Sequence, residues 1–335
     1  MKHRQRGVAL ISILLIVALV TALVYHLLTR HTLVVAHTRT TVYGDRSLQY
    51  ALGAEAYARQ LLFQDWNDTE TRKIDTLADV WALPGVPFDV EGGTLSIQIH
   101  DLDGRFNLNS VTAAEGSKSL GRFKTMLESV GVDPAIADRW RDWIDADSES
   151  TGFGAEDNYY LGLPNPYRAA NRPAADASEL RLLEGVDAAV YHLLEANVVA
   201  LPVDSARTNI NTATALALQS LSSRLTLAQA QALVESNRQY PDTQSLIAEI
   251  PELGAAADSM KVTSDFFEVL ARAEINGVRV DTRSVLYRNP LDGTITLLGR
   301  DFGHPFPRTL ATDQSTDGNT DKTADGADKA MGSGG

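Results

Sequence analysis

The sequence predicts an α+β fold that combines a long N-terminal helix, a small antiparallel sheet and a large helical domain inserted in that sheet. Three observations carry this prediction. First, residues 8–28 form a long run without charged side chains. Second, strand-like alternation occurs near residue 95 and again after residue 264, and third, helical patterns dominate between those two regions. Because strand patterns enclose the helical ones, we expect one sheet that is interrupted by a helical insertion.

The first element is a continuous helix. Val8–Leu28 carries no Asp, Glu, Lys or Arg, and a helix of that length spans roughly 30 Å, the thickness of a bilayer core. The stretch that follows continues the helical pattern to about Phe63. Apolar residues at spacings of three and four share one face of it: Ala51, Ala54, Ala58 and Leu61.

The charges around the apolar run predict its orientation and its processing. Lys2, Arg4 and Arg6 precede the run, which places the short head in the cytoplasm and the rest of the chain outside. No A-x-A cleavage site of a secretory signal follows it. The pattern RGVALIS resembles the leader of type IV pilins and type II secretion pseudopilins. That resemblance implies cleavage between Gly7 and Val8 by a prepilin peptidase and methylation of the new amino terminus. A simple signal anchor is the alternative.

Ser12 departs from the pattern of this leader class. Most members carry Glu five residues into the mature chain, where it pairs with the amino terminus of a neighbouring subunit, and here that position is Ser12. A buried unpaired carboxylate is costly in lipid. A subunit at the tip of a filament, which lacks such a neighbour, is therefore more stable without it.

The patterns divide the chain into six segments. Turns into short strands are predicted at Asp103-Gly104, Asn276-Gly277 and Asp292-Gly293. The end of the chain has too few apolar residues to offset the entropy of ordering, so we expect it to be disordered. The segments are 1–7 (leader), 8–65 (N-terminal helix), 66–110 (first part of the β region), 111–263 (inserted helical domain), 264–302 (second part of the β region) and 303–335 (tail).

Composition excludes several classes of function. The formal net charge of −13 disfavours nucleic-acid binding, and the absence of cysteine excludes disulfides, thiolate metal sites and cysteine nucleophiles. The stretches RTNINTATALALQSL and LLEGVDAAV resemble helix-hairpin-helix motifs. The hairpin after the first, LSSRLTLAQA, has no glycine, and the one glycine of the second is flanked by Glu184 and Asp187, which favours packing modules. The sequence contains no H-E-x-x-H, G-x-S-x-G or P-loop motif, and we expect no enzymatic role.

The acidic stretch DADSESTGFGAED, Asp145–Asp157, is a candidate metal site. It holds five carboxylates and no Lys or Arg, so its charges repel one another unless water or a cation compensates them. Oxygen ligands in a flexible loop favour calcium. Ser150 stands where an EF-hand requires glycine, so we expect a calcium loop that is not an EF-hand, with a solvated acidic loop as the alternative. EF-hand spacing places ligands at Asp145, Asp147, Glu149, Thr151 and Glu156.

Several motifs together resemble the K-type minor pseudopilins of type II secretion systems. They are the RG leader, Ser12, DLDGRFNLNSV, DWIDADSES followed by GAEDNYYL, NRPAADASELRLLEGVD and TNINTA. The resemblance extends to about Arg300 and implies a pilin-like fold with calcium in the inserted domain. The residues that match the family's acidic motif are Asp145, Asp147, Glu156 and Asp157. Glu149 and Thr151 are ligand candidates from spacing alone.

The resemblance also implies partners and a location. The partners would be the minor pseudopilins I and J, together with H and the major pseudopilin, and the prepilin peptidase. The protein would cross the bacterial inner membrane once, with its main domain in the periplasm, and would form the tip of the pseudopilus that supports export across the outer membrane. A type IV pilus minor pilin is one alternative. A membrane-anchored DNA-binding protein of helix-hairpin-helix type is another, and the acidic net charge argues against it.

Overall fold

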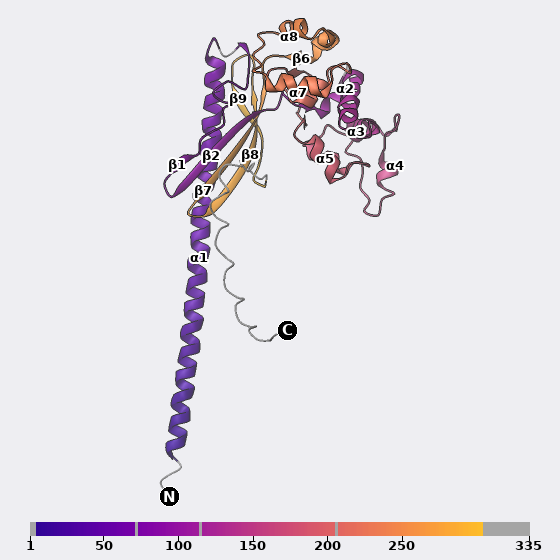
Figure 1. Ribbon diagram of the computed structural model, residues 1–335. Helices are drawn as coiled ribbons and strands as arrows, with labels where there is room; N and C mark the ends of the chain where they lie inside the picture. Colours follow the sequence, from indigo (N-terminus) through magenta and orange to yellow (C-terminus); the bar gives the residue numbers. More distant parts are fainter. Residues whose placement is uncertain (1–4, 71–72, 114–115, 205–206, 304–335) are drawn as a thin grey trace, which may run out of the picture.

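The computed structural model describes residues 5–70, 73–113, 116–204 and 207–303. Its longest element is helix α1, Gln5–Asn67, which ends a few residues beyond the predicted end. Figure 1 shows α1 as a straight rod that carries the rest of the molecule at the end distant from the N-terminus. Within the described residues, α1 is the one helix long and apolar enough to cross a membrane. The first part of the predicted leader and the tail from residue 304 lie outside the described residues.

The C-terminal half of α1 packs on the sheet through small residues. Ala51, Ala54 and Ala58 are almost fully buried, and their short side chains let the helix lie close to the strands. The next buried position on this face is Leu62, whereas the predicted Leu61 is half-buried. The sheet residues in the same core include alternate positions of two strands: Ile97, Ile99, Val269, Ala271 and Ala273.

The sheet has five strands in the order β1-β2-β7-β8-β9, with antiparallel neighbours. Asn276 and Gly277 both have positive φ, 49° and 78°, which is the geometry of a two-residue hairpin turn. The hairpins predicted there and at Asp292-Gly293 are confirmed. The strands are β1 Phe88–Val90, β2 Gly93–Asp101, β7 Phe266–Ile275, β8 Val278–Arg288 and β9 Ile295–Asp301.

The insertion connects β2 to β7, which are themselves neighbours with Asp101 opposite Phe267. The short strand predicted after Asp103-Gly104 is present as β3, Phe106–Asn107. However, β3 pairs in parallel with β4, Val198–Val199, inside the insertion and not with the main sheet. By strand pairing, the chain therefore leaves the sheet at Asp101, earlier than the boundary that the sequence predicted at 111. A second parallel pair joins β5, Thr208–Asn209, to β6, Met260–Lys261.

The helices of the insertion form two hydrophobic cores, one around Trp140 and one around Leu218. Side-chain caps start several of them; in α7, Thr226 and Gln229 form a capping box. Gly185, at φ +84°, separates η3 from α5 as predicted. The helical elements are η2 Leu108–Thr112, α2 Gly116–Ser129, α3 Ala135–Ile144, α4 Asp157–Tyr160, η3 Ala177–Leu182, α5 Ala188–Leu194, α6 Ala215–Gln219, α7 Leu227–Glu235, α8 Thr243–Glu249 and η4 Pro251–Ser259.

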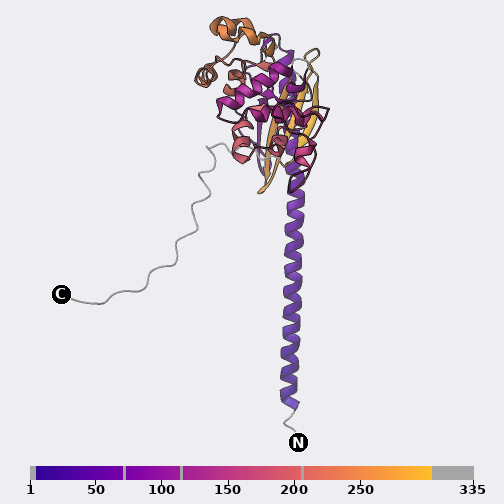
Figure 2. The ribbon, with the colours of Figure 1, turned by 90° about the vertical axis from the view of Figure 1, so that its right-hand side faces the viewer.

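The insertion covers the face of the sheet that is turned away from α1. Figure 1 shows the sheet between α1 and the helices α2, α3 and α5, and in Figure 2, after a quarter turn, the helices lie in front of the sheet. Both views place the insertion at the end of the molecule opposite the N-terminus. The molecule is therefore a rod with a broad, asymmetric head.

Candidate metal centre

Helix α3 fixes the start of the acidic loop. Its apolar face is buried in the core around Trp140, and the Trp140 indole N–H donates to the carbonyl oxygen of Leu108 at 2.9 Å. This bond ties α3 to η2. The helix ends at Ile144, and the backbone of the next residue, Asp145, is extended at φ −74° and ψ 170°. The chain therefore turns out of the helix at the first predicted ligand.

The loop brings three predicted ligands together. Carboxylate oxygens of Asp145, Asp147 and Glu156 all lie within 4.8 Å of one another. Glu156 is buried at 4% exposure, Asp145 is half-buried and Asp147 is exposed. Oδ1 of Asp145 and both carboxylate oxygens of Glu156 are buried and accept no hydrogen bond. Buried acceptors without donors are destabilising, so these oxygens have the chemistry of a cation site.

The same crowding perturbs the protonation of Asp145 and Glu156. Burial and the negative charges of Asp142, Asp145 and Asp147 together raise the pKa of Glu156 to about 7. Burial and the charges of Asp147 and Asp142 raise the pKa of Asp145 to about 6. Both shifts have the direction expected for carboxyls whose burial and negative neighbours outweigh any nearby positive charge, which for Asp145 is that of Arg141. A divalent cation between these groups would remove the repulsion.

Asp142 holds the loop through hydrogen bonds, and it was not among the predicted ligands. Its side chain is fully buried. It accepts hydrogen bonds from the Thr151 hydroxyl at 2.6 Å and from the Thr151 backbone N–H at 3.0 Å. A Cβ atom at Gly154 would lie 1.8 Å from Oδ2 of Asp142, so the loop needs glycine at that point. A carboxylate on the apolar face of α3, flanked by Trp140 and Trp143, was the sequence signal for this role.

The other three predicted ligands make different contacts. Glu149 is exposed, and its backbone N–H donates to Oδ1 of Asp147 at 2.8 Å. The hydroxyl of Thr151 binds Asp142, as described above. Asp157 pairs with Arg168 at 2.5 Å and accepts from the Ala169 N–H at 2.9 Å. Arg168 lies outside the acidic stretch, so sequence spacing gave no sign of this pairing.

Asn171 reaches the cluster from a distant loop. Its backbone is in the left-handed region at φ 46°, and its N–H donates to the Trp143 carbonyl at 3.0 Å. Its side-chain amide donates to the backbone carbonyl of Asp147, also at 3.0 Å. The Asn171 side-chain oxygen is buried and accepts no hydrogen bond. Another oxygen of the type that calcium prefers therefore lies beside the loop.

The loop does not continue into an EF-hand. The helix that follows it, α4, has four residues, too few to be the exit helix of such a motif. This agrees with the expectation from Ser150. The predicted processing residues Gly7 and Val8 lie within α1, and cleavage between them stays a prediction.

An anchoring helix, a pilin-like sheet and an inserted helical domain with an acidic loop define the class of a membrane-anchored pilin-type subunit. Residues 104–203, which include that loop, match the family model described as type II secretion system (T2SS), protein K. Type II secretion system protein K of Pseudomonas aeruginosa is 34% identical, with 95% of this chain and 99% of the relative covered. The Klebsiella pneumoniae protein of that name is 32% identical, with 90% and 96% covered.

The chain belongs to the type II secretion system protein K family. The Pectobacterium carotovorum member is 35% identical, with 70% of this chain and 76% of the relative covered. A chain of the solved GspK-GspI-GspJ complex from the type 2 secretion system of enterotoxigenic Escherichia coli superposes with a TM-score of 0.71. That match has 24% identity and covers 80% of this chain and all of the other, which shows the fold. The predicted family and fold class are confirmed, and the type IV pilin and DNA-binding alternatives are disfavoured.

Proposed function

We propose that the protein is a minor pseudopilin that forms the tip of the periplasmic pseudopilus together with the minor pseudopilins I and J. The position of the insertion carries this proposal. The inserted helices lie against one side of the sheet at the end of the molecule distant from the N-terminus (Figure 2), where they would block a further subunit from stacking above. The role is structural, and we assign no catalytic step to the chain.

In our proposal, helix α1 has two successive roles. Its N-terminal part is exposed and apolar, so it anchors the subunit in the inner membrane with the head in the periplasm, and later packs against helices of other pseudopilins. Those neighbours include protein H and the major pseudopilin. The prepilin peptidase cleaves after Gly7 and methylates Val8 before assembly.

Co-purification tests the tip assignment. The tagged full-length chain, extracted in detergent, should retain proteins I and J of its own secretion system. Minor pilins of a type IV pilus, expressed to the same level, are the control and should be lost on washing. Retention of the pilins in place of I and J would overturn the assignment.

A glycine substitution tests the processing step. Gly7→Leu should leave a membrane-bound precursor that keeps its leader, because a bulky residue does not fit the position before the cut. Gly53→Ala is the control, since a methyl group there meets no atom within 4 Å, and this variant should be cleaved normally. Mass spectrometry of the extracted proteins gives the N-terminus, and a wild-type protein that starts at Met1 would refute cleavage.

We further propose that calcium occupies the acidic loop, with Asp145, Asp147 and Glu156 as its carboxylate ligands. The unpartnered buried oxygens of Asp145 and Glu156 support this proposal, and the Asn171 side-chain oxygen is a further candidate donor. Magnesium should substitute poorly, because it demands tighter octahedral geometry and keeps its waters. Calcium would hold the loop on α3 and so stabilise the half of the insertion built around Trp140.

Thermal unfolding with calcium or with a chelator tests the metal assignment. At a calcium concentration of about 100 times Kd, calcium binding should raise the free energy of unfolding by roughly 2.7 kcal/mol. For a domain of this size, that corresponds to a rise of roughly 5–10 °C in melting temperature. Asp147→Asn should abolish the difference. Glu149→Gln is the matched control, because it lies in the same loop but outside the cluster, and it should keep the difference. Equal melting of the wild type in both conditions would refute calcium binding.

A further inference from the structure

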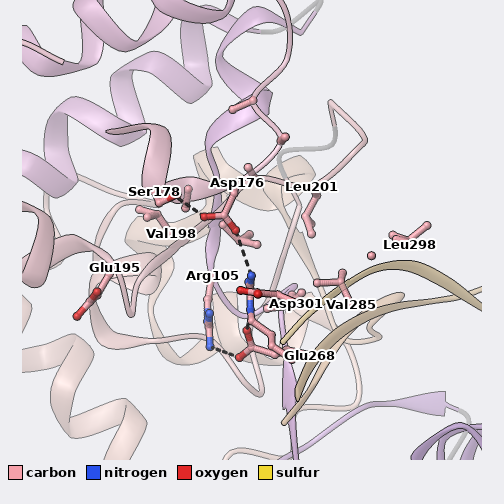
Figure 3. Close-up of a pocket in the computed structure, with 18 of the residues that line it drawn as sticks. Arg105, Asp176, Ser178, Glu195, Val198, Leu201, Glu268, Val285, Leu298 and Asp301 are labelled. Carbon is pink, nitrogen blue, oxygen red and sulfur yellow. Dashed lines mark hydrogen bonds and ion pairs between the residues drawn. The ribbon is translucent and has the colours of Figure 1, made fainter. Parts of the chain in front are cut away.

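A large cavity separates the insertion from the outer face of the sheet. Its volume is about 960 Å³. Strands β7, β8 and the end of β9 form one wall, and residues 174–178 and 195–202 of the insertion form the other. Figure 3 shows charged side chains that project into this space from both walls. The lining mixes these charged groups with apolar side chains, and the two walls do not pack directly against each other here.

A chain of ion pairs crosses the cavity. Arg283 of β8 donates from Nε to Glu268 of β7 at 2.5 Å and from an Nη atom to Asp176 of the insertion at 3.1 Å. Glu268 also lies 3.4 Å from the guanidinium of Arg105, near the start of the insertion, and 3.3 Å from Nδ1 of His100. Figure 3 shows Asp176 and Glu268 on opposite sides of this space and a dashed line between Arg105 and Glu268. The chain therefore runs from the sheet into the insertion.

Asp176 has a second role at the start of η3. It is the N-cap of η3, and Oδ1 accepts a hydrogen bond from the Ser178 backbone N–H at 2.9 Å. Its other oxygen, Oδ2, accepts from Arg283. One side chain thus fixes the end of η3 and joins that end to the sheet.

The apolar contact between the two parts lies close to the point where the chain leaves and re-enters the sheet. Leu102, Val199, Leu201 and Phe266 form a small buried cluster there, with Val285 and Tyr287 packed against it. Elsewhere in the described residues, α1 packs on the sheet strands, and the inserted helices pack mainly on one another. The apolar contact between the two parts is therefore small, and it lies near the connections beside buried hydrogen bonds such as that from Asn209 to Asp101 at 3.2 Å.

We propose that Arg283 and Asp176 form a latch that fixes the angle between the sheet and the half of the insertion built around Trp140, and that the small apolar cluster of Leu102, Val199, Leu201 and Phe266 is the pivot. Loss of the latch allows this half of the insertion to rotate across the cavity. Arg283 is thus a positioning residue for the head of the molecule. The inference is independent of the proposed metal and of the proposed partners.

The groups of the latch carry their charges at neutral pH. Burial tends to raise the pKa of Asp176, but the hydrogen bonds from Ser178 and the charge of Arg283 outweigh it and keep the pKa below the usual value. Burial tends to lower the pKa of Arg283, but Glu268 and Asp176 raise it above the usual value. The latch therefore stays closed through the neutral range.

Distance measurements between two spin labels test the latch. The chain has no cysteine, so cysteines introduced at Leu193 on α5 and Thr296 on β9, both exposed, label the two walls. In the full-length protein in detergent, Arg283→Met should broaden the wild-type distance distribution and add a longer-distance population. Asp176→Asn should do the same. Asparagine keeps the N-cap, so this variant reports on the ion pair even if Arg283→Met fails to fold.

Arg272→Met is the matched control. Arg272 on β7 pairs with Asp281 on β8 at 2.9 Å, so it is a comparable ion pair that lies wholly within the sheet. This variant should keep the wild-type distribution. Wild-type distributions in both latch variants would overturn the proposal. The same broadening in Arg272→Met would also overturn it, because the effect would then come from a general weakening of the sheet.

Discussion

At the scale of single residues, the acidic loop depends on a glycine as much as on its carboxylates. A methyl group at Gly154 would overlap Asp142 Oδ2 at 1.8 Å, and the buried Asp142 side chain cannot move without losing Thr151. Gly154→Ala should therefore destabilise the protein by about 1–3 kcal/mol and reduce the response to calcium. Gly121→Ala in α2, where nothing lies within 4 Å, should stabilise it by about 0.5–1 kcal/mol. Chemical denaturation measures both, and equal stability of the two variants would contradict the geometry.

The raised pKa values of two carboxyls in the loop also predict how the calcium response depends on pH. Without an ion, the pKa is raised from 3.8 to about 6 for Asp145 and from 4.5 to about 7 for Glu156. The folded protein then holds protons that the unfolded chain releases, so these groups stabilise the metal-free fold at low pH, and this stabilisation is lost as the pH rises to about 7. Because calcium competes with the same protons, its effect on the melting temperature should grow from about pH 5 to about pH 8. A constant effect across this range would exclude these two residues as ligands.

At the scale of elements, one buried carboxylate joins α1 to the sheet. Glu55 is 4% exposed and accepts from Ser284 at 2.7 Å and from Arg300 at 2.8 Å. Glu55→Ala would leave these donors unsatisfied and should cost about 1.5–3 kcal/mol. Glu70→Ala is the control, because Glu70 makes an exposed surface pair with Lys73, and it should change stability by about 0.5 kcal/mol or less. Denaturation of the detergent-solubilised proteins measures the difference, which should vanish if Glu55 is merely a surface residue.

At the scale of the whole molecule, the topology predicts that the insertion can be removed. Strands β2 and β7 are antiparallel neighbours that meet at Asp101 and Phe267, so a short Asn-Gly turn can connect them. A chain in which residues 102–266 are replaced by such a turn should keep the core between α1 and the sheet. It should unfold cooperatively by circular dichroism and show no response to calcium. An unfolded product would mean that the insertion contributes to the folding of the sheet.

The sequence by itself determined those elements of the protein that follow from residues close together in the chain. The length of the apolar run, the Asn276-Gly277 and Asp292-Gly293 turns and the alternation in the strands predict α1 and the sheet, because each reflects a local backbone preference or a side-chain period. The acidic loop was visible for the same reason, since its charges are close together in the chain. Family motifs in the same sequence supplied the membership that the comparisons confirm.

Only the tertiary structure decided which of these residues meet. It brings the carboxylates of Asp145, Asp147 and Glu156 together and pairs Asp157 with Arg168. It also paired β3 with β4, and placed Arg283 against Asp176, which is 107 positions away in the sequence. Local patterns cannot specify such contacts, because a helical or strand period fixes which residues share a face but not which distant segment covers that face. Long-range packing and the desolvation of charge make that choice.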